Sequence, residues 1–194
     1  MQLEKSDTSK SLVKMISRNI RTWHHNHAIL YDLACMFEGK INYVEIGCFA
    51  GASACLLLQR PNTKVIAIDT EDAYTKEQVL TNIADYRYNK YNNQFIFIKG
   101  SSKNKKVVNS VQSLIGDNGI HVLFIDGDHS VESAKEDFRL YAPLVRKGGW
   151  IVFDDYGGKD CPGVKIAVDE MKENGIFEAY IEYFIFNEYI LQKL

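Results

Sequence analysis

The chain has 194 residues, of which 46% are hydrophobic and 25% are charged, and its formal net charge is -2. This size and composition predict one globular domain whose core needs no disulfide or metal to hold it together. They exclude a membrane span, because no apolar run approaches the roughly 18 residues that a span requires. The net charge also argues against a nucleic-acid partner. Since the first residues carry no apolar run typical of a signal peptide, we expect a cytoplasmic protein.

Residues 1–40 precede the first predicted strand and have an amphipathic, helical pattern. We expect them to form a helical cover over the site of the main domain, residues 41–194. The cover contains the run WHHNH at 23–27, in which helical spacing would place His24 and His27 on adjacent faces. Imidazole is a good ligand for Zn and Ni. Because the run lies before the first strand, we predict a structural or solvated role, with contact to an acceptor pocket as the alternative.

Short β-rich runs then alternate with longer helical stretches. The predicted strands are 41–47, 63–69, 94–100, 121–127 and 149–155, and the predicted helices are 52–59, 76–88, 105–114, 131–145 and 164–174. Most of these strands are continuous Val/Ile/Phe runs, which is typical of a parallel sheet covered by helices on both faces. The last two runs, 177–184 and 187–194, alternate more and predict an antiparallel hairpin at one edge. The expected fold is α/β, with a doubly wound, mostly parallel sheet of seven strands.

The loop after the first strand reads VEIGCFAGAS, residues 44–53. Gly47 ends the strand and Gly51 opens the next helix, so the backbone can turn tightly and approach a ligand closely. Ser53 falls in the first helical turn, where amide N–H groups and a hydroxyl can bind a carboxylate. Taken alone, the loop could equally be a plain strand–helix turn that uses glycine for its geometry.

Asp69 closes the second strand, about 20 residues after Gly47, where an acidic side chain is placed to bind ribose hydroxyls. The loop lacks the G-x-G-x-x-G pattern, which disfavours a dinucleotide. Glu45 inside the loop would repel a phosphate and attract an ammonium group. Ammonium, carboxylate and ribose together describe S-adenosylmethionine, and the stretch resembles the first motif of the class I methyltransferases. The cofactor-binding residues that we expect are Glu45, Gly47, Cys48, Phe49, Gly51, Ser53, Asp69, Gly100, Ser101, Ser102 and Asp126.

Acidic residues also follow two later strands. The fourth strand ends in IDGDH, with Asp126, Asp128 and His129, and the fifth ends in FDDY, with Asp154 and Asp155. If these strands are neighbours, the carboxylates converge at one mouth, which is unfavourable unless a cation neutralises them. Carboxylate ligands suit Mg²⁺ or Mn²⁺. The alternative is a set of solvated aspartates that cap helix N-termini.

Residues 124–171 resemble the macrocin-type O-methyltransferases, which methylate sugar hydroxyls, and more distantly the catechol and caffeoyl-coenzyme A O-methyltransferases. The resemblance implies that Asp126, Asp154 and Asp155 bind the metal and that Asp128 is the general base. His129 falls where the catechol-type enzymes place a lysine base and is the reserve candidate. The N-terminal region, which shapes the acceptor pocket, is shorter here than in the macrocin group, so the acceptor is not carried over.

The resemblance implies a metal-dependent O-methyltransferase that moves a methyl group from S-adenosylmethionine to a hydroxyl of a sugar or glycosylated small molecule. A catechol-like polyphenol acceptor is the nearest alternative. An NAD-dependent oxidoreductase on a similar sheet would fit Asp69 but not the glycine pattern, and a catalytically silent binding module is a third reading. We expect a small-molecule or saccharide partner, no nucleic acid and no membrane. A homodimer is compatible with the sequence, which does not fix the oligomeric state.

Other features predict no site. Lys103 to Lys106 read as a solvated face. Tyr86, Tyr88 and Tyr91 could stack on a ligand or lie on a helix surface. The four cysteines have no metal-site spacing and read as reduced thiols.

Overall fold

The structure, a computed structural model, describes residues 3–20, 27–85, 88–89 and 91–194 and has one seven-stranded sheet. The strands are β1 (Ile41–Ile46), β2 (Thr63–Asp69), β3 (Gln94–Lys99), β4 (Ile120–Ile125), β5 (Val145–Phe153), β6 (Tyr180–Ile185) and β7 (Glu188–Lys193). The α-helices are α1 (Asp7–Ile16), α2 (Ala28–Cys35), α3 (Ala52–Leu57), α4 (Lys76–Ala84), α5 (Lys105–Ile115), α6 (Val131–Tyr141) and α7 (Pro162–Glu173).

The sheet confirms the predicted fold class. Its strand order is β3-β2-β1-β4-β5-β7-β6; β1 to β5 pair in parallel, and β7 is antiparallel to both β5 and β6. All residues of β1 and β4 are buried, as their continuous apolar runs predict. The chain moves from β1 to β2 in one direction and from β4 to β5 in the other. This reversal places the loops after β1 and β4 side by side, where α/β sheets bind their ligands.

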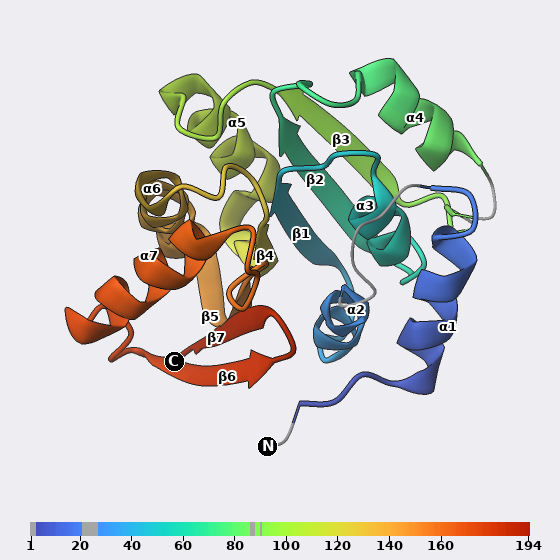
Figure 1. Ribbon diagram of the computed structural model, residues 1–194. Helices are drawn as coiled ribbons and strands as arrows, with labels where there is room; N and C mark the ends of the chain where they lie inside the picture. Colours follow the sequence, from blue (N-terminus) through green and yellow to red (C-terminus); the bar gives the residue numbers. More distant parts are fainter. Residues whose placement is uncertain (1–2, 21–26, 86–87, 90) are drawn as a thin grey trace.

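Helices cover both faces of the sheet (Figure 1). Helices α1 to α4 share one apolar core with one face, and α5 to α7 share a second core with the other. Helix α5 illustrates the pattern, because its buried residues Val107, Val111 and Ile115 recur every four positions and form one stripe. Each face is therefore sealed, and the strand ends are left as the place where polar groups can gather.

The N-terminal helices join the main core. Asp32 of α2 accepts hydrogen bonds from the Ser6 hydroxyl (2.6 Å) and the Ser9 hydroxyl (2.6 Å), which tie α2 to the start of α1. Leu30 and Leu33 of α2 are fully buried in the same core as α3. Helices α1 and α2 thus pack on one face of the sheet, and His27 directly precedes α2. A role of residues 1–40 as a cover over the site stays a prediction.

Three predicted helices are shorter than expected. The helix predicted over 52–59 ends at Leu57. The helix predicted over 76–88 ends at Ala84, and Asp85 after it is extended. The helix predicted over 131–145 ends at Tyr141 and continues as a single 3₁₀ turn, Ala142–Leu144. Pro143 lies in that turn and has no N–H to continue the α-helical ladder.

Two predicted strands begin elsewhere. Strand β5 begins at Val145 rather than residue 149, because Val145 pairs with Ile120 across a register shift. Strand β6 begins at Tyr180 rather than residue 177, since the chain turns after α7 through Gly175, at φ +73°. Strands β4 and β5 also end two residues earlier than predicted, at Ile125 and Phe153, so the acidic residues lie in the loops that follow the strands.

The structure also tests the expectations about membrane-spanning helices and about the state of the cysteines. Among the described residues, no helix is both long and apolar enough to cross a bilayer. Cys35, Cys48, Cys55 and Cys161 are all free thiols, as predicted.

His121 in β4 should make the stability of the fold depend on pH. Its imidazole is buried, Nδ1 accepts the N–H of Asn42 at 3.1 Å, and the Arg146 guanidinium lies 3.1 Å from Nε2. Burial and the Arg146 charge lower the His121 pKa from 6.5 to about 4. The unfolded chain therefore gains a proton near pH 6.5 that the folded chain does not yet bind. The contribution of neutral His121 to the free energy of unfolding is complete above pH 6.5 and is lost as the pH falls toward 4.

Urea unfolding at pH 7 and pH 4.5 measures this effect. The free energy of unfolding should fall by on the order of 2 kcal/mol through His121 alone. His121→Gln should remove that part of the pH dependence. An unchanged pH dependence in His121→Gln would show that other groups cause the loss.

Candidate functional site

A cavity of about 880 Å³ opens at the carboxyl ends of the parallel strands. The loops after β1 and β4, which the strand order brings together, both contribute to its wall. Twelve of the predicted site residues line it: Gly47, Cys48, Phe49, Ser53, Asp69, Gly100, Ser101, Ser102, Asp126, Asp128, His129 and Asp155. The other three, Glu45, Gly51 and Asp154, are not among the described residues of the wall.

The loop after β1 presses against the loop after β4. Gly47 has φ +87°, and a Cβ at this position would lie 1.9 Å from the carbonyl oxygen of Asp126. Gly51, at φ +83°, directly precedes α3. Both glycines are therefore required by geometry, and Gly47 also by the close approach of a second backbone segment.

Asp69 at the end of β2 holds the same loop. Its Oδ2 accepts the N–H groups of Cys48 (2.8 Å) and Phe49 (3.0 Å), and its Oδ1 accepts the N–H of Glu71 at 2.6 Å. Asp69 also lines the cavity, at the position predicted for a ribose contact. The contact between Asp69 and a ribose stays a prediction. The hydrogen bonds in the structure show that Asp69 also positions the loop after β1.

Glu45 lies behind the loop, where it is fully buried. Its Oε2 accepts the hydroxyls of Ser53 (2.7 Å) and Tyr43 (2.9 Å). Burial raises the Glu45 pKa to about 7, although hydrogen bonds from Ser53, Cys48 and Tyr43 oppose the shift. Glu45 thus acts on the cavity through Ser53, and its predicted attraction for an ammonium group stays a prediction.

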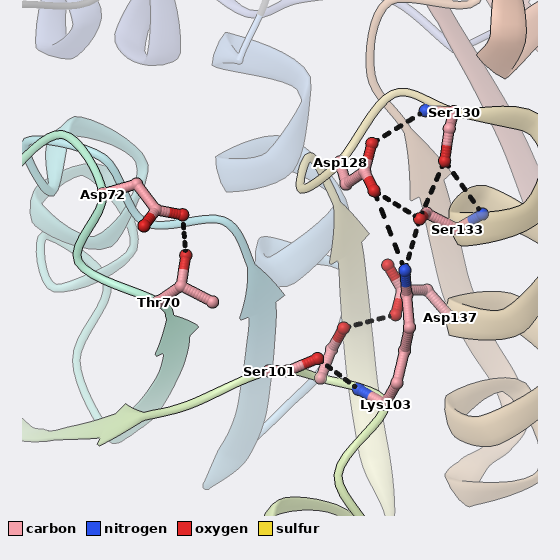
Figure 2. Close-up of polar contacts among 9 residues, drawn as sticks. Thr70, Asp72, Ser101, Lys103, Asp128, Ser130, Ser133 and Asp137 are labelled. Carbon is pink, nitrogen blue, oxygen red and sulfur yellow. Dashed lines mark hydrogen bonds and ion pairs between the residues drawn. The ribbon is translucent and has the colours of Figure 1, made fainter.

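Asp128 belongs to a polar network on the other side of the cavity (Figure 2). Its carboxylate accepts the N–H of Ser130 (3.1 Å) and the hydroxyl of Ser133 (2.6 Å), and Lys103 Nζ lies 3.7 Å away. These contacts, led by the Ser133 hydrogen bond, lower the Asp128 pKa. Lys103 is 42% exposed, as the prediction of a solvated lysine run requires, and it also lines the cavity. The carboxylate of Asp137 accepts the Ser102 hydroxyl at 2.6 Å and fixes the loop after β3.

The acidic cluster divides into two neighbouring groups of metal-ligating atoms. Asp126 and Asp154 form one group with His27, and Asp155 forms the other with His129 and Cys161; within each group the ligand atoms lie within 4.8 Å of one another. His129 joins the two groups. Its Nε2 lies 3.5 Å from Asp126 Oδ1 and 3.6 Å from Asp155 Oδ2. The three predicted metal ligands therefore do converge, but imidazoles lie among them.

Backbone strain and shifted pKa values both occur in this cluster. Asp155 has φ +58°, a left-handed conformation that a non-glycine residue rarely adopts. Burial raises the Asp126 pKa to about 6, against the opposing hydrogen bond from His129. Burial also opposes a charge on His27, but the hydrogen bond to Asp154 and the nearby carboxylates outweigh it and raise the His27 pKa to about 9. Strain and perturbed pKa values that meet in a cavity are typical of an active site.

The donor atoms fit a divalent cation. Carboxylates at this density repel one another unless a positive charge lies between them. The spacing of ligand atoms in each group is that of side chains that can reach one ion. In this chain, a metal would be held by Asp126 and Asp154, with Asp155 from the adjoining group.

Several features escaped the sequence analysis. His27 lines the cavity, hydrogen-bonds Asp154 and is only 11% exposed, so a solvated role does not hold for this residue. Its contact with an acceptor stays a prediction. Its position just before an apolar helical run was the available signal. Cys161, 3.0 Å from His129 Nδ1, carried no signal of its own. His24 and Tyr86 lie outside the described residues.

The tyrosines do not form a ligand platform in the described part of the chain. Tyr88 is buried in the hydrophobic core and Tyr91 is exposed. Neither is among the described residues that line the cavity.

Comparisons with known proteins identify the family of the chain. Residues 44–156, more than half of the chain, match the model of a family described as a methyltransferase domain. Over 147 residues the chain is 39% identical to the uncharacterized protein R132 of Acanthamoeba polyphaga mimivirus. The aligned residues make up 74% of this chain and 65% of the viral protein. The match thus spans less than two thirds of that relative.

Solved structures share the fold over nearly the whole chain. The MycE methyltransferase from the mycinamycin biosynthetic pathway, in complex with Mg and SAH, has a TM-score of 0.68 at 15% identity, over 98% of this chain and 55% of that one. The O-methyltransferase NovP has a TM-score of 0.62 at 21% identity, over 96% of this chain and 78% of that one. The O-methyltransferase from Bacillus cereus, in complex with SAH, has a TM-score of 0.65 at 13% identity, over 100% of this chain and 94% of that one. The chain belongs to the methyltransferase-domain family and has the fold of S-adenosylmethionine-dependent O-methyltransferases.

Proposed function

We propose that this protein transfers the methyl group of S-adenosylmethionine to a hydroxyl oxygen of a sugar or glycosylated small molecule, with the help of a divalent metal. One observation carries the proposal: a single cavity is lined both by the Gly47–Ser53 loop and by Asp126 and Asp155. The cofactor and the acidic cluster therefore meet in one space. A nicotinamide cofactor is disfavoured, because the family match is to methyltransferases and the loop lacks the dinucleotide glycine pattern.

The residues divide the work between them. The loop, held by Asp69, orients the cofactor, and positioning alone can supply much of the rate of a group transfer. A divalent cation bound at the carboxylates would lower the pKa of the acceptor hydroxyl. A side chain beside those carboxylates then accepts the hydroxyl proton as the methyl group moves. Asp128 and His129 are the two candidates that line the cavity.

The geometry favours His129 over Asp128 as the base. His129 Nε2 lies between Asp126 and Asp155, where an acceptor oxygen would be held. The Asp128 carboxylate is occupied by Ser130 and Ser133. We therefore expect His129→Gln to lower kcat by about 10²-fold or more and Asp128→Asn by less, because general bases contribute about 10²–10⁴-fold. Initial rates at saturating acceptor give the kcat of each variant. A larger loss of kcat in Asp128→Asn than in His129→Gln would identify Asp128 as the general base.

Two of the structural relatives support transfer of the methyl group to a hydroxyl of a small molecule. One is named for the mycinamycin biosynthetic pathway and has been solved with mycinamycin VI, and NovP is named an O-methyltransferase. A methyl-release screen with Mg²⁺ or Mn²⁺ across saccharide and catechol acceptors tests the proposal. Turnover should occur with saccharides and cease in EDTA. Turnover only with catechols would replace the acceptor class, and full turnover by metal-free protein would remove the metal.

Cofactor choice has its own test, which needs no acceptor. Thermal-shift titrations with S-adenosylhomocysteine and with NAD compare the two nucleoside classes directly. Only S-adenosylhomocysteine should raise the melting temperature. A rise with NAD alone would overturn the proposed reaction.

A further inference from the structure

The N-terminal segment places an imidazole inside the acidic cluster. His27 Nε2 lies 3.0 Å from Asp154 Oδ2, and the His27 side chain is only 11% exposed. Its ring packs edge-on against Phe124 of β4, with 5.1 Å between ring centroids. Packing and the hydrogen bond together fix the direction in which the ring nitrogen points.

A fourth carboxylate lies behind this imidazole. Glu188, the first residue of β7, is fully buried, and neither of its carboxylate oxygens has a hydrogen-bond partner in the described part of the chain. The pairs Val152–Ile190 and Phe153–Tyr189 fix the register of β5 against β7. Asp154 directly follows the last of these pairs on β5, and Glu188 directly precedes Tyr189 on β7, so an extension of the register by one residue would bring Asp154 and Glu188 opposite each other.

The register also fixes the face of the sheet. Side chains alternate between faces, so Asp154 and Glu188 share the face of Val152 and Ile190. That face is covered by α1 and α2, the helices that bring His27. The charges that act on Glu188 are those of His27, Lys5, Asp154 and Asp126. A buried carboxylate without hydrogen bonds is costly, unless positive charge lies close by.

We propose that His27, together with Asp126 and Asp154, binds the metal of this protein directly, and that the buried carboxylate of Glu188 supports the site from behind. The proposal deepens the proposed function and rests on its metal requirement. It assigns the site a mixed nitrogen–oxygen ligand set. Mg²⁺ prefers oxygen ligands alone, whereas imidazole suits transition metals. The site should therefore take a transition-metal dication in preference to Mg²⁺.

Glu188 is a positioning residue in this scheme. It does not line the cavity in the described structure, and its buried carboxyl group interacts electrostatically with His27 and Asp154. Partners that stand behind metal ligands typically change metal affinity by about 10- to 100-fold when they are removed.

Electron spin-echo spectroscopy of Mn²⁺ on the full chain tests the proposal without any acceptor or turnover. Wild-type protein loaded with one equivalent of Mn²⁺ should show nitrogen modulation from a directly bound imidazole. Incorporation of ¹⁵N-histidine should change that modulation, which identifies the ligand without any substitution. His27→Gln should abolish the modulation and His129→Gln should retain it, so the second variant is the matched control for an imidazole at the other side of the cluster.

Affinity provides the second readout. Titration of Mn²⁺ against Mg²⁺ should show that His27→Gln loses about tenfold or more of the preference for Mn²⁺, because the remaining ligands are oxygens. Glu188→Gln, which keeps the shape but not the charge, should weaken Mn²⁺ binding about tenfold and retain the nitrogen modulation. S-adenosylhomocysteine binding by each variant confirms that it is folded.

The outcomes separate this inference from the function on which it rests. Mn²⁺ binding to the wild type without nitrogen modulation, or modulation that persists in His27→Gln, overturns the role of His27 and leaves the proposed function intact. A wild type that binds S-adenosylhomocysteine but no Mn²⁺ overturns the metal requirement and this inference together.

Discussion

Replacing Gly47 with alanine should abolish cofactor binding. The new Cβ would lie 1.9 Å from the carbonyl oxygen and 2.6 Å from the carbonyl carbon of Asp126, and backbone atoms cannot move aside as a flexible side chain can. The loop after β1 must then separate from the loop after β4. We expect the dissociation constant for S-adenosylhomocysteine, measured by isothermal titration calorimetry, to rise by about 100-fold or more, since each tenfold requires only 1.4 kcal/mol.

A matched control separates this clash from simple backbone strain. Gly148 also has positive φ, +73°, but a Cβ there would meet nothing within 4 Å. Gly148→Ala should therefore lose about 1 kcal/mol of folding stability and keep its affinity for the cofactor. If Gly47→Ala and Gly148→Ala bind S-adenosylhomocysteine equally well, the close packing of the two loops does not shape the cofactor site.

Replacing Asp155 with asparagine should abolish metal-dependent methyl transfer while cofactor binding survives. Asparagine tolerates the left-handed conformation of Asp155, at φ +58°, so the backbone is kept and only the charge is lost. The side chain lines the cavity beside His129, and the hydrogen bonds that hold the cofactor loop come from Asp69 instead. We expect kcat to fall by about 10³-fold, because a metal site contributes several kcal/mol to such a reaction.

Parallel measurements make this expectation specific. S-adenosylhomocysteine affinity should change less than threefold, which is about 0.6 kcal/mol. Asp117→Asn, in the exposed 3₁₀ turn Gly116–Asn118, removes the same charge far from the cavity and should leave kcat unchanged. A normal kcat for Asp155→Asn at limiting Mg²⁺ would exclude this carboxylate from the metal site.

The fold could be predicted from the sequence because its signals are local. The apolar runs of β1 and β4 specify buried parallel strands wherever they lie in the chain. The residues at the ends of those strands then follow from a general property of α/β sheets, which gather ligands at one edge. This is why most of the predicted site residues line one cavity.

The parts that could not be predicted depend on long-range packing. His27 and Asp154 are 127 residues apart in the sequence, and only the docking of α2 against β4 brings them together. Cys161 meets His129 through the path of a loop that carries no periodic pattern. Lys103 reads as one of several surface lysines until the geometry of Asp128 shows which one turns inward.

The hydrogen bonds from the N–H groups of Cys48 and Phe49 to Asp69 lie entirely within the chain and need no ligand to complete them. The ordering of the loop is therefore achieved during folding, and the arriving cofactor does not have to supply it from its own binding energy. Such preorganisation reduces the entropy that is lost on association. These two amides should accordingly exchange slowly with solvent deuterium before any ligand is added, with the cofactor entering a groove that is already set.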